Sequence, residues 1–118
     1  MKVAVVGSRT LKIKNIGNYI PKNTTEIVSG GAKGVDTCAR EYSIQNNIKL
    51  TEFLPDYKKY GRIAPLKCSL QIIACADLVL DFWDGKSRGT AFVIDNCRKS
   101  GVPVEVCIIC WHKFFYII

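Results

Sequence analysis

The sequence predicts an α/β fold with a mainly parallel sheet of about five strands and helices on both faces. Short apolar segments of strand character alternate with segments whose apolar residues recur at helical spacing. The first strand segment, residues 2–6, is almost continuously apolar, as a buried parallel strand is. Three strand segments end in turns rich in glycine, serine and cations, and each turn precedes a predicted helix.

Each element follows from its own local pattern. The predicted strands are residues 2–6, 26–28, 48–54, 77–82 and 102–109. The predicted helices are residues 13–20, 35–45, 66–76 and 90–99. Pro21 closes the first helix and Gly101 ends the last. Residues 57–65 are polar, aromatic and irregular, which predicts a loop that covers a site.

Helical spacing also predicts which residues face the core. In the second helix these are Val35, Cys38, Ala39 and Tyr42. In the third helix they are Leu66, Leu70, Ile73 and Ala74.

The length and composition predict one folded domain over residues 1–118, with 48% apolar residues to form a core. The net charge of +7 favours anionic partners without naming one. The cations that stand out lie in predicted loops beside glycines: Arg9, Lys33, Arg62, Lys67, Lys86 and Arg88. A nucleic-acid-binding protein more often carries its cations along one helix face, and this sequence shows no such strip.

The start of the chain runs directly into an apolar strand and has no signal-peptide pattern. No apolar run approaches the roughly 18 residues that a membrane span needs. We therefore expect a cytoplasmic protein with no membrane partner.

Three of the six cysteines, Cys38, Cys75 and Cys97, fall on apolar stretches of predicted helices, and we expect them to be small buried hydrophobic residues, as is usual in a reducing compartment. Cys107 and Cys110 form a C-x-x-C pair near His112, but no second pair stands at zinc spacing. Core packing is therefore favoured over redox or metal chemistry, and no metal is predicted. The apolar residues 111–118 extend the sheet, cover a face or form a subunit contact, and we expect a homo-oligomer.

The three turns share one chemistry. They are Gly7-Ser8-Arg9, residues 29–34 and residues 85–90. Glycine lets the backbone approach a ligand, and the first N–H groups of the following helix can donate to phosphate oxygens. Serine and threonine hydroxyls in the turns can donate to the same oxygens, and Arg9, Lys33 and Arg88 can neutralise charge.

The carboxyl ends of parallel strands meet at one edge of a sheet, and ligands bind there near the reversal of strand order. The turns therefore predict one crevice for a phosphate-bearing ligand. The dinucleotide fingerprint G-x-G-x-x-G and the P-loop pattern are both missing. The sequence supports neither an ordinary NAD-dependent dehydrogenase nor a P-loop NTPase.

Some side chains in and near these turns have two possible roles. Asp36 either complements the start of its helix or binds a ribose hydroxyl or a water. Asp84 either forms the turn or contacts the ligand, and Trp83 either stacks on a base or packs half-buried. The irregular segment either closes over the ligand or covers apolar surface, through Tyr57, Tyr60 and Arg62.

Four segments together carry a family resemblance: residues 5–9, 27–36, 60–67 and 77–90. With their G-S-R, S-G-G-A-x-G-x-D and W-D-G-x-S-x-G-T motifs, the chain resembles the YspA-like branch of the SLOG superfamily over about residues 2–106. That superfamily also includes the DNA-processing protein DprA and the Lonely Guy phosphoribohydrolases. The resemblance implies a Rossmann-like three-layer α/β/α fold and a pocket for nucleotides or their derivatives.

Two departures limit what the resemblance implies. Val93 stands where Lonely Guy enzymes have a glutamate that takes part in cleaving the N-glycosidic bond. A carboxylate is needed for that step, and only Asp36 or Asp84 remain as weak catalytic candidates. Cys68-Ser69 replaces an Arg-Asn pair that relatives usually have, and Lys67 or Arg62 could compensate.

The leading hypothesis is a binding module for a nucleotide-like ligand, used in sensing or signalling, with no certain cofactor. Its phosphate would lie on Gly30-Gly31 and residues 87–90, with Arg9 and Arg88 as counter-charges. The alternatives are a nucleotide N-glycosidase or phosphoribohydrolase, and single-stranded nucleic-acid binding as in DprA. The candidate ligand-binding residues are Gly7, Ser8, Arg9, Ser29, Gly30, Gly31, Ala32, Gly34, Asp36, Arg62, Lys67, Trp83, Asp84, Gly85, Ser87, Arg88, Gly89 and Thr90.

Overall fold

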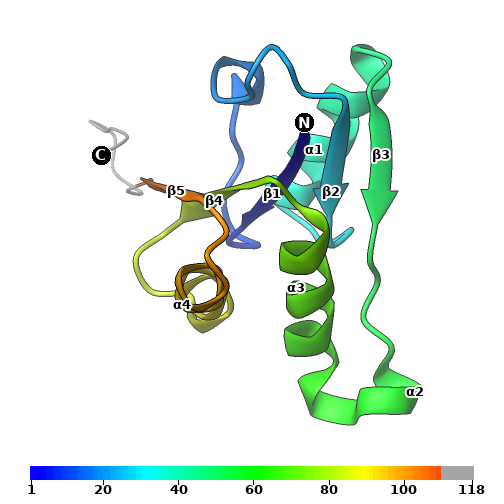
Figure 1. Ribbon diagram of the computed structural model, residues 1–118, viewed down its shortest axis with the longest axis vertical. Coiled ribbons are helices and arrows are strands. Elements are labelled where there is room, and N and C mark those ends of the chain that lie inside the picture. The colour runs from blue at the N-terminus through cyan, green and yellow to red at the C-terminus, as the bar shows by residue number, and fades with distance from the viewer. Residues whose placement is uncertain (110–118) are drawn as a thin grey trace.

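The computed structural model describes residues 1–109 and has a five-stranded sheet at its centre (Figure 1). The strands are β1 (Lys2–Gly7), β2 (Glu26–Ser29), β3 (Lys49–Glu52), β4 (Leu78–Trp83) and β5 (Val104–Ile108). Their order is β3-β2-β1-β4-β5, and every neighbouring pair is parallel. The chain moves outward from β1 to β3 and then returns to the other side of β1, so the strand order reverses between β1 and β4.

Helices cover both faces of this sheet. The α-helices are α1 (Val35–Gln45), α2 (Tyr57–Tyr60), α3 (Ala64–Cys75) and α4 (Arg88–Ser100), and two 3₁₀ turns are η1 (Ile16–Asn18) and η2 (Gly61–Ile63). α1 packs on one face with η1, whereas α3 and α4 lie on the other face (Figure 1). The predicted three-layer, Rossmann-like α/β/α fold is confirmed.

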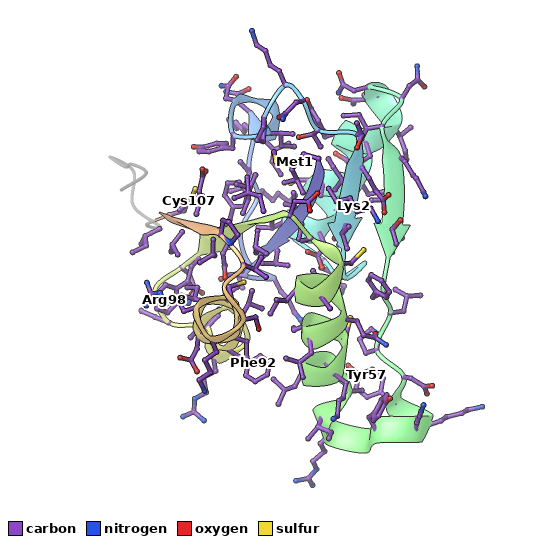
Figure 2. All side chains as sticks on the ribbon, viewed as in Figure 1. Met1, Lys2, Tyr57, Phe92, Arg98 and Cys107 are labelled. Atoms are coloured by element: carbon purple, nitrogen blue, oxygen red, sulfur yellow. The ribbon has the colours of Figure 1, made fainter. Side chains whose placement is uncertain are left out.

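The alternation of side chains along β1 divides the core into two halves. Val3 and Val5 point to the α1 side, where they pack with Val35. Ala4 and Val6 point to the other side, where they pack with residues of α3 and α4. Side chains fill the space between the sheet and the helices on each face (Figure 2). Because a parallel strand buried on both faces has no polar side, β1 is apolar from Val3 to Val6, and its one charged residue, Lys2, is exposed at the start of the strand.

The end of β1 touches the start of α1 so closely that only glycine fits. A Cβ atom at Gly7 would lie 2.6 Å from Val35 Cγ2 and 2.7 Å from the carbonyl oxygen of Phe82. Gly7 is therefore needed for packing between helix and strand.

The predicted helix over residues 13–20 is wrong. This segment is an irregular connection that contains only the single turn η1. Its apolar residues Leu11, Ile13, Ile16 and Ile20 are nevertheless buried against the sheet. Gly17 and the neighbouring asparagines favour turns over helix, which accounts for the difference.

The predicted loop over residues 57–65 is also wrong in part. Its first half forms α2, where the Asp56 carboxylate accepts a hydrogen bond of 3.1 Å from the N–H of Lys59 as an N-cap. α3 begins at Ala64, two residues earlier than predicted, and Pro65 occupies its first turn.

The inward face predicted for α3 is wrong at three of its four residues. Ile73 is buried, but Leu66, Leu70 and Ala74 are exposed. The buried face carries Ala64, Cys68, Ile72 and Ile73. α3 is apolar on both faces, so its periodicity did not define a single inward side.

The other elements were predicted in kind, with boundaries that shift by a few residues. α1 has the predicted bounds, and α4 begins at Arg88, so the end of the third glycine turn is helical. Cys97 is buried, whereas Cys38 and Cys75 are half-buried. The predictions for Cys110, His112 and the apolar tail fall outside the described residues. Within residues 1–109, no helix is long and apolar enough to cross a membrane.

Candidate functional site

A crevice of about 360 Å³ opens at the carboxyl edge of the sheet, next to the reversal of strand order between β1 and β4. Residues from all three glycine turns line it, as predicted, and α3 forms a further wall. This is the place where open parallel sheets bind their ligands. The residues that line it are Val6, Gly7, Ser8, Arg9, Thr10, Gly30, Ala32, Asp36, Pro55, Pro65, Leu66, Cys68, Ser69, Ile72, Asp84, Ser87, Gly89, Thr90 and Val93.

Direct contacts hold the three turns together. The N–H of Asp84 donates a 3.2 Å hydrogen bond to Ser8 Oγ, and the N–H of Ser8 donates a 3.0 Å bond to the carbonyl of Phe82. These bonds join the turn after β1 to the turn after β4. Gly34, at φ 74°, approaches Arg9 so closely that a Cβ atom would lie 2.5 Å from its carbonyl oxygen. The second turn is therefore packed against the first.

The crevice has one polar side and one apolar side. Backbone and hydroxyl groups of the turns form the polar side. The other side is formed by side chains of Pro65, Leu66 and Ile72 from α3 and Val93 from α4. A few polar groups opposite an apolar wall are typical of small-molecule sites.

The N-terminus of α4 opens into the polar side of the crevice. Its N-cap residue Ser87 makes no side-chain capping bond, and the first turn holds no acidic residue. The first N–H groups of a helix have no acceptor within it, so those of Arg88, Gly89 and Thr90 can donate to a ligand. The helix dipole adds partial positive charge at this point.

Asp84 organises the turn that leads into α4. Its carboxylate accepts bonds of 2.8 Å from the N–H groups of Lys86 and Ser87, and one of 2.9 Å from the Ser87 hydroxyl. Partial desolvation acts to raise the pKa of Asp84, but the hydrogen bonds outweigh it and lower that pKa. Trp83 supports the same turn, because its Nε1 donates a 2.9 Å bond to the carbonyl of Ser87. Asp84 therefore has the contacts of its turn-forming role, and Trp83 is half-buried, as its packing role predicts.

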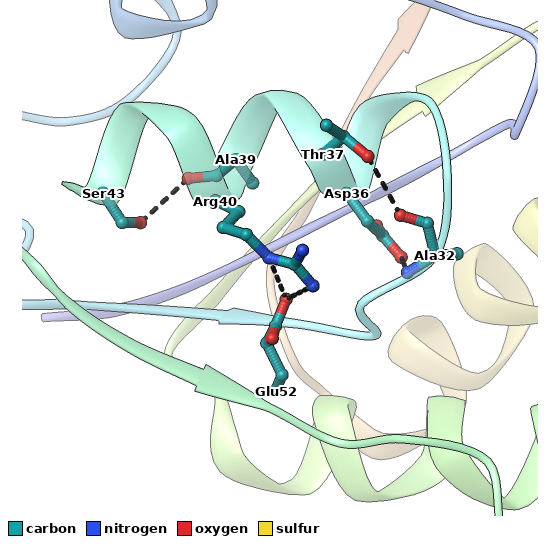
Figure 3. Close-up of polar contacts among 7 residues, drawn as sticks. All are labelled: Ala32, Asp36, Thr37, Ala39, Arg40, Ser43 and Glu52. Carbon is teal, nitrogen blue, oxygen red and sulfur yellow. Dashed lines mark hydrogen bonds and ion pairs between the residues drawn. The ribbon is translucent and has the colours of Figure 1, made fainter. Parts of the chain in front are cut away.

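Asp36 lies in the first turn of α1 and lines the crevice with only 7% of its surface exposed. One carboxylate oxygen accepts a 3.0 Å bond from the N–H of Ala32 (Figure 3). Burial raises the pKa of Asp36, while the Ala32 N–H, the nearby Ser29 hydroxyl and Arg9 act against that rise. Its charge makes the N-terminus of α1 a poor place for an anion.

Only some of the hydroxyls can donate to a ligand. The Ser87 hydroxyl donates to Asp84, and Thr90 Oγ1 donates to the carbonyl of Ser87 at 3.1 Å. Ser8 Oγ accepts the Asp84 N–H, and the Ser8 hydroxyl also lies close enough to the Asp84 carboxylate to help lower its pKa. Ser29 Oγ is buried without a well-formed hydrogen bond, and its residue does not line the crevice.

Ten of the predicted ligand-binding residues line the crevice, and the other eight do not. Gly31 has φ 71°, and a Cβ atom there would lie 2.6 Å from Leu54, so its role is in the backbone turn. Lys67 Nζ instead lies over the ring of Tyr60, 5.8 Å from its centroid. The residues outside the lining are Ser29, Gly31, Gly34, Arg62, Lys67, Trp83, Gly85 and Arg88.

The two departures from the family pattern both fall in the crevice wall. Val93 is 3% exposed and lines the crevice, so an aliphatic side chain stands at the position of the Lonely Guy glutamate. Cys68 and Ser69 also line it, and the Cys68 thiol donates to the carbonyl of Phe53. Burial raises the pKa of Cys68, with a smaller contribution from Asp36.

Sequence reasoning missed the apolar wall and Thr10. Residues such as Val6, Pro65 and Ile72 have the same apolar character as core residues, so their sequence gave no sign of a ligand site. The segment before α3 was the only part of the sequence that indicated a further wall of the site, since it was predicted to cover a site.

A comparison with protein-family models finds a match to the first half of the chain. A family model described as DNA recombination-mediator protein A matches residues 1–60, which hold β1, β2, α1, β3 and the first two glycine turns. No curated protein and no solved structure matches the chain significantly. The family model covers half of the chain, and the matched half holds the first two glycine turns. The chain therefore belongs to the DNA recombination-mediator protein A family, within the SLOG superfamily.

Proposed function

We propose that this protein binds a nucleotide or a nucleotide-derived ligand through its phosphate, in the crevice at the carboxyl edge of the sheet. The observation that carries this proposal is the uncapped N-terminus of α4, which opens into the crevice without an acidic residue in its first turn. Free N–H donors and the helix dipole favour an anion at such a position.

Electrostatics favour α4 over the second glycine turn as the phosphate site. A phosphate beside Gly30 would meet the Asp36 carboxylate, and the N–H of Ala32 already donates to that carboxylate. At α4 two cations are near, because Arg9 lines the crevice and Arg88 begins the helix. The Asp84 carboxylate is also near, but it already accepts the N–H groups of Lys86 and Ser87 that precede the helix. The ligand phosphate is therefore placed at residues 87–90 in this proposal.

The rest of the ligand would occupy the remaining crevice. A base or another flat apolar group fits the wall formed by Pro65, Leu66, Ile72 and Val93. Asp36 faces the same space and would accept hydrogen bonds from ligand hydroxyl or amino groups. The volume of about 360 Å³ lies in the range usual for small-molecule sites.

The proposal includes a biological setting. The resemblance to the YspA-like branch supports a single-domain sensor or signalling module that works in the cytoplasm. Turnover is not part of the proposal, because Val93 replaces the glutamate that the hydrolase alternative needs.

A thermal-shift experiment with nucleoside mono-, di- and triphosphates and ADP-ribose tests the proposal. The variant to use is Gly89→Leu. A Cβ atom at Gly89 meets no atom within 4 Å, and the residue lines the crevice, so a leucine would fill ligand space without strain. We expect at least one phosphate compound to raise the Tm of the native chain and to lose that effect in Gly89→Leu.

Asp95→Leu is the matched control, because Asp95 is exposed on the same helix and does not line the crevice. It should respond to ligand like the native chain. If no phosphate compound shifts the native Tm at millimolar concentration, or if Gly89→Leu responds like the control, the proposal is wrong.

Single-stranded nucleic acid is a second candidate ligand. The family match and the net charge of +7 favour it. Fluorescence anisotropy with labelled oligonucleotides at several salt concentrations tests it, since phosphate contacts give a steep salt dependence. Binding that is absent, or that does not weaken with salt, would exclude this candidate.

A further inference from the structure

The crevice contains a nearly buried carboxylate that has no counter-ion in contact with it. Asp36 lines the crevice with 7% of its surface exposed, and among residues 1–109 it forms no ion pair. Its Oδ2 atom accepts the N–H of Ala32 (Figure 3). Each carboxylate oxygen has two acceptor positions, so Asp36 keeps acceptor capacity for a further partner. Because a buried carboxylate is costly without partners, a donor-rich ligand group would stabilise it.

The polar side chains beside Asp36 offer no donor to a ligand. The Cys68 thiol donates to the carbonyl of Phe53. The Ser29 hydroxyl is fully buried close to the Asp36 carboxylate, and its residue does not line the crevice. The side-chain surface that this part of the crevice presents to a ligand is therefore an acceptor surface.

Asp36 meets the apolar wall of the crevice around Gly30, which also lines the crevice. A Cβ atom at Gly30 would lie 3.2 Å from Asp36 Oδ2. The same atom would lie 3.7 Å from Ile72 Cδ1 and 4.0 Å from Cys68 Sγ. The missing side chain thus leaves space that is shared by the carboxylate and the wall. A flat ring there would contact Ile72 and present its edge to the carboxylate.

The distance from the proposed phosphate position favours the base of the ligand over its sugar. Asp36 lies in the helix that follows β2, whereas α4 follows β4, and β1 lies between these two strands. Two strand spacings amount to about 10 Å. In a nucleotide the ribose hydroxyls lie near the 5′-phosphate, and the outer edge of the base lies one ring farther away. Asp36 is therefore placed to meet the edge of the base.

We propose that Asp36 selects guanine in the ligand, by accepting hydrogen bonds from the N1–H and from the exocyclic amino group of the base. This inference deepens the proposed function and rests on it. Guanine is the one common nucleobase with two adjacent donors on its base-pairing edge. Adenine and cytosine place their amino group beside a ring nitrogen that is an acceptor, and uracil flanks its one N–H with two carbonyl oxygens. Each of these bases would set an acceptor against the carboxylate.

Titration calorimetry of the full chain with nucleoside 5′-monophosphates and 5′-diphosphates tests the proposal. Guanine nucleotides should bind most tightly, and their deoxyribose forms should bind with similar affinity, because the base and not the sugar is recognised. Inosine nucleotides lack the amino group and should bind at least about 10-fold more weakly, since hydrogen bonds to a charged group are worth about 10- to 100-fold in affinity. Adenine, cytosine and uracil nucleotides should bind more weakly than guanine nucleotides by at least the same factor.

The outcomes separate this inference from the proposed function. If no nucleotide binds, both are wrong. If nucleotides bind without regard to the base, or if adenine nucleotides bind most tightly, the selection of guanine is wrong and the proposed function stands. Guanine nucleotides that bind only with ribose would show that Asp36 recognises the sugar, and this result would also overturn the inference.

Asp36→Asn provides a test that a folding defect cannot imitate. The asparagine oxygen can still accept the Ala32 N–H, and the amide then presents one acceptor and one donor to the base. Xanthine has the matching edge, an N1–H beside a carbonyl oxygen. The variant should therefore lose affinity for guanine nucleotides by about 10-fold or more and should bind xanthosine phosphates more tightly than the native chain does.

Glu41→Gln is the matched control, because Glu41 is exposed on the same helix and does not line the crevice. This variant should keep the native preference for guanine. An Asp36→Asn variant that also keeps this preference, or that gains no affinity for xanthosine phosphates, would overturn the assignment of base selection to Asp36.

Discussion

The N–H of Asp84 donates a hydrogen bond of 3.2 Å to the hydroxyl oxygen of Ser8, which lies 76 residues earlier in the chain. This bond spans the point where the strand order reverses, so it fixes the two turns that flank the crevice. Ser8 is 3% exposed, and water does not readily replace its oxygen.

Ser8→Ala should therefore destabilise the fold by about 1–2 kcal/mol, because the Asp84 N–H loses its acceptor. Urea unfolding followed by circular dichroism measures the effect. Ser100→Ala, at an exposed position at the end of α4, is the control and should change stability by less than about 0.5 kcal/mol. Equal stability of the two variants would show that the Ser8 bond does not hold the turns.

Alanine at Gly31 and at Gly89 should have opposite effects. Gly31 has φ 71° and faces Leu54, so Gly31→Ala should cost at least about 1–2 kcal/mol from the backbone alone. Gly89 lies in α4 with open space around it, so Gly89→Ala should be neutral or should stabilise by about 0.5–1 kcal/mol. Paired urea titrations decide this, and a stable Gly31→Ala variant would contradict the turn geometry.

The glycine turns also show how far the sequence predicted the site. Their position at the strand ends follows from the element pattern, and so does their convergence in a parallel sheet. The reason for individual glycines did not follow. Gly7 and Gly34 make room for Val35 and for the backbone of Arg9, contacts that exist only once α1 lies on the sheet. Such tertiary contacts cannot be predicted from the local sequence.

α3 shows a second limit of prediction from the sequence, which concerns the inward face of a helix. α1 was predicted to the residue because Val35 and Ala39 recur on one face between polar residues. α3 has apolar residues all round, so the same method selected Leu66 and Leu70 as inward when Cys68 and Ile72 are buried. The apolar wall of the crevice was missed for a related reason, since wall residues and core residues have the same chemistry.

Asp84→Ala should destabilise the protein by about 1–2 kcal/mol at neutral pH. The variant removes three hydrogen bonds to a carboxylate that is only partly buried, so solvent reduces the loss. The folded-state pKa of Asp84 is lowered, so its contribution is present above the unfolded pKa and is lost as pH falls through the folded pKa. Urea unfolding at pH 7 and pH 3 should show a smaller difference between native and variant at pH 3. An undiminished difference at pH 3 would contradict this assignment.

Asp81 should make the protein less stable as pH rises through the neutral range. Its side chain is fully buried in β4 between Val6 and Val106, and neither carboxylate oxygen has a hydrogen-bond partner among residues 1–109. Burial raises the pKa of Asp81 to about 8. Between the unfolded pKa of about 4 and this value, the unfolded chain has lost a proton that the folded chain keeps. The free energy of unfolding should therefore fall by up to about 1.4 kcal/mol per pH unit across that range.

Urea unfolding of the native chain and of Asp81→Asn at pH 5, 6, 7 and 8 tests this prediction. The asparagine amide adds an unpaired donor, so the absolute stability of the variant can shift either way, and the slope against pH is the quantity to compare. Asp81→Asn should remove the downward slope. Asp95→Asn alters an exposed carboxylate that pairs with Lys99 on the surface, and it should keep the native slope. A native chain whose stability is flat from pH 5 to pH 8 would mean that Asp81 finds a proton donor in the folded protein, and the raised pKa would then be wrong.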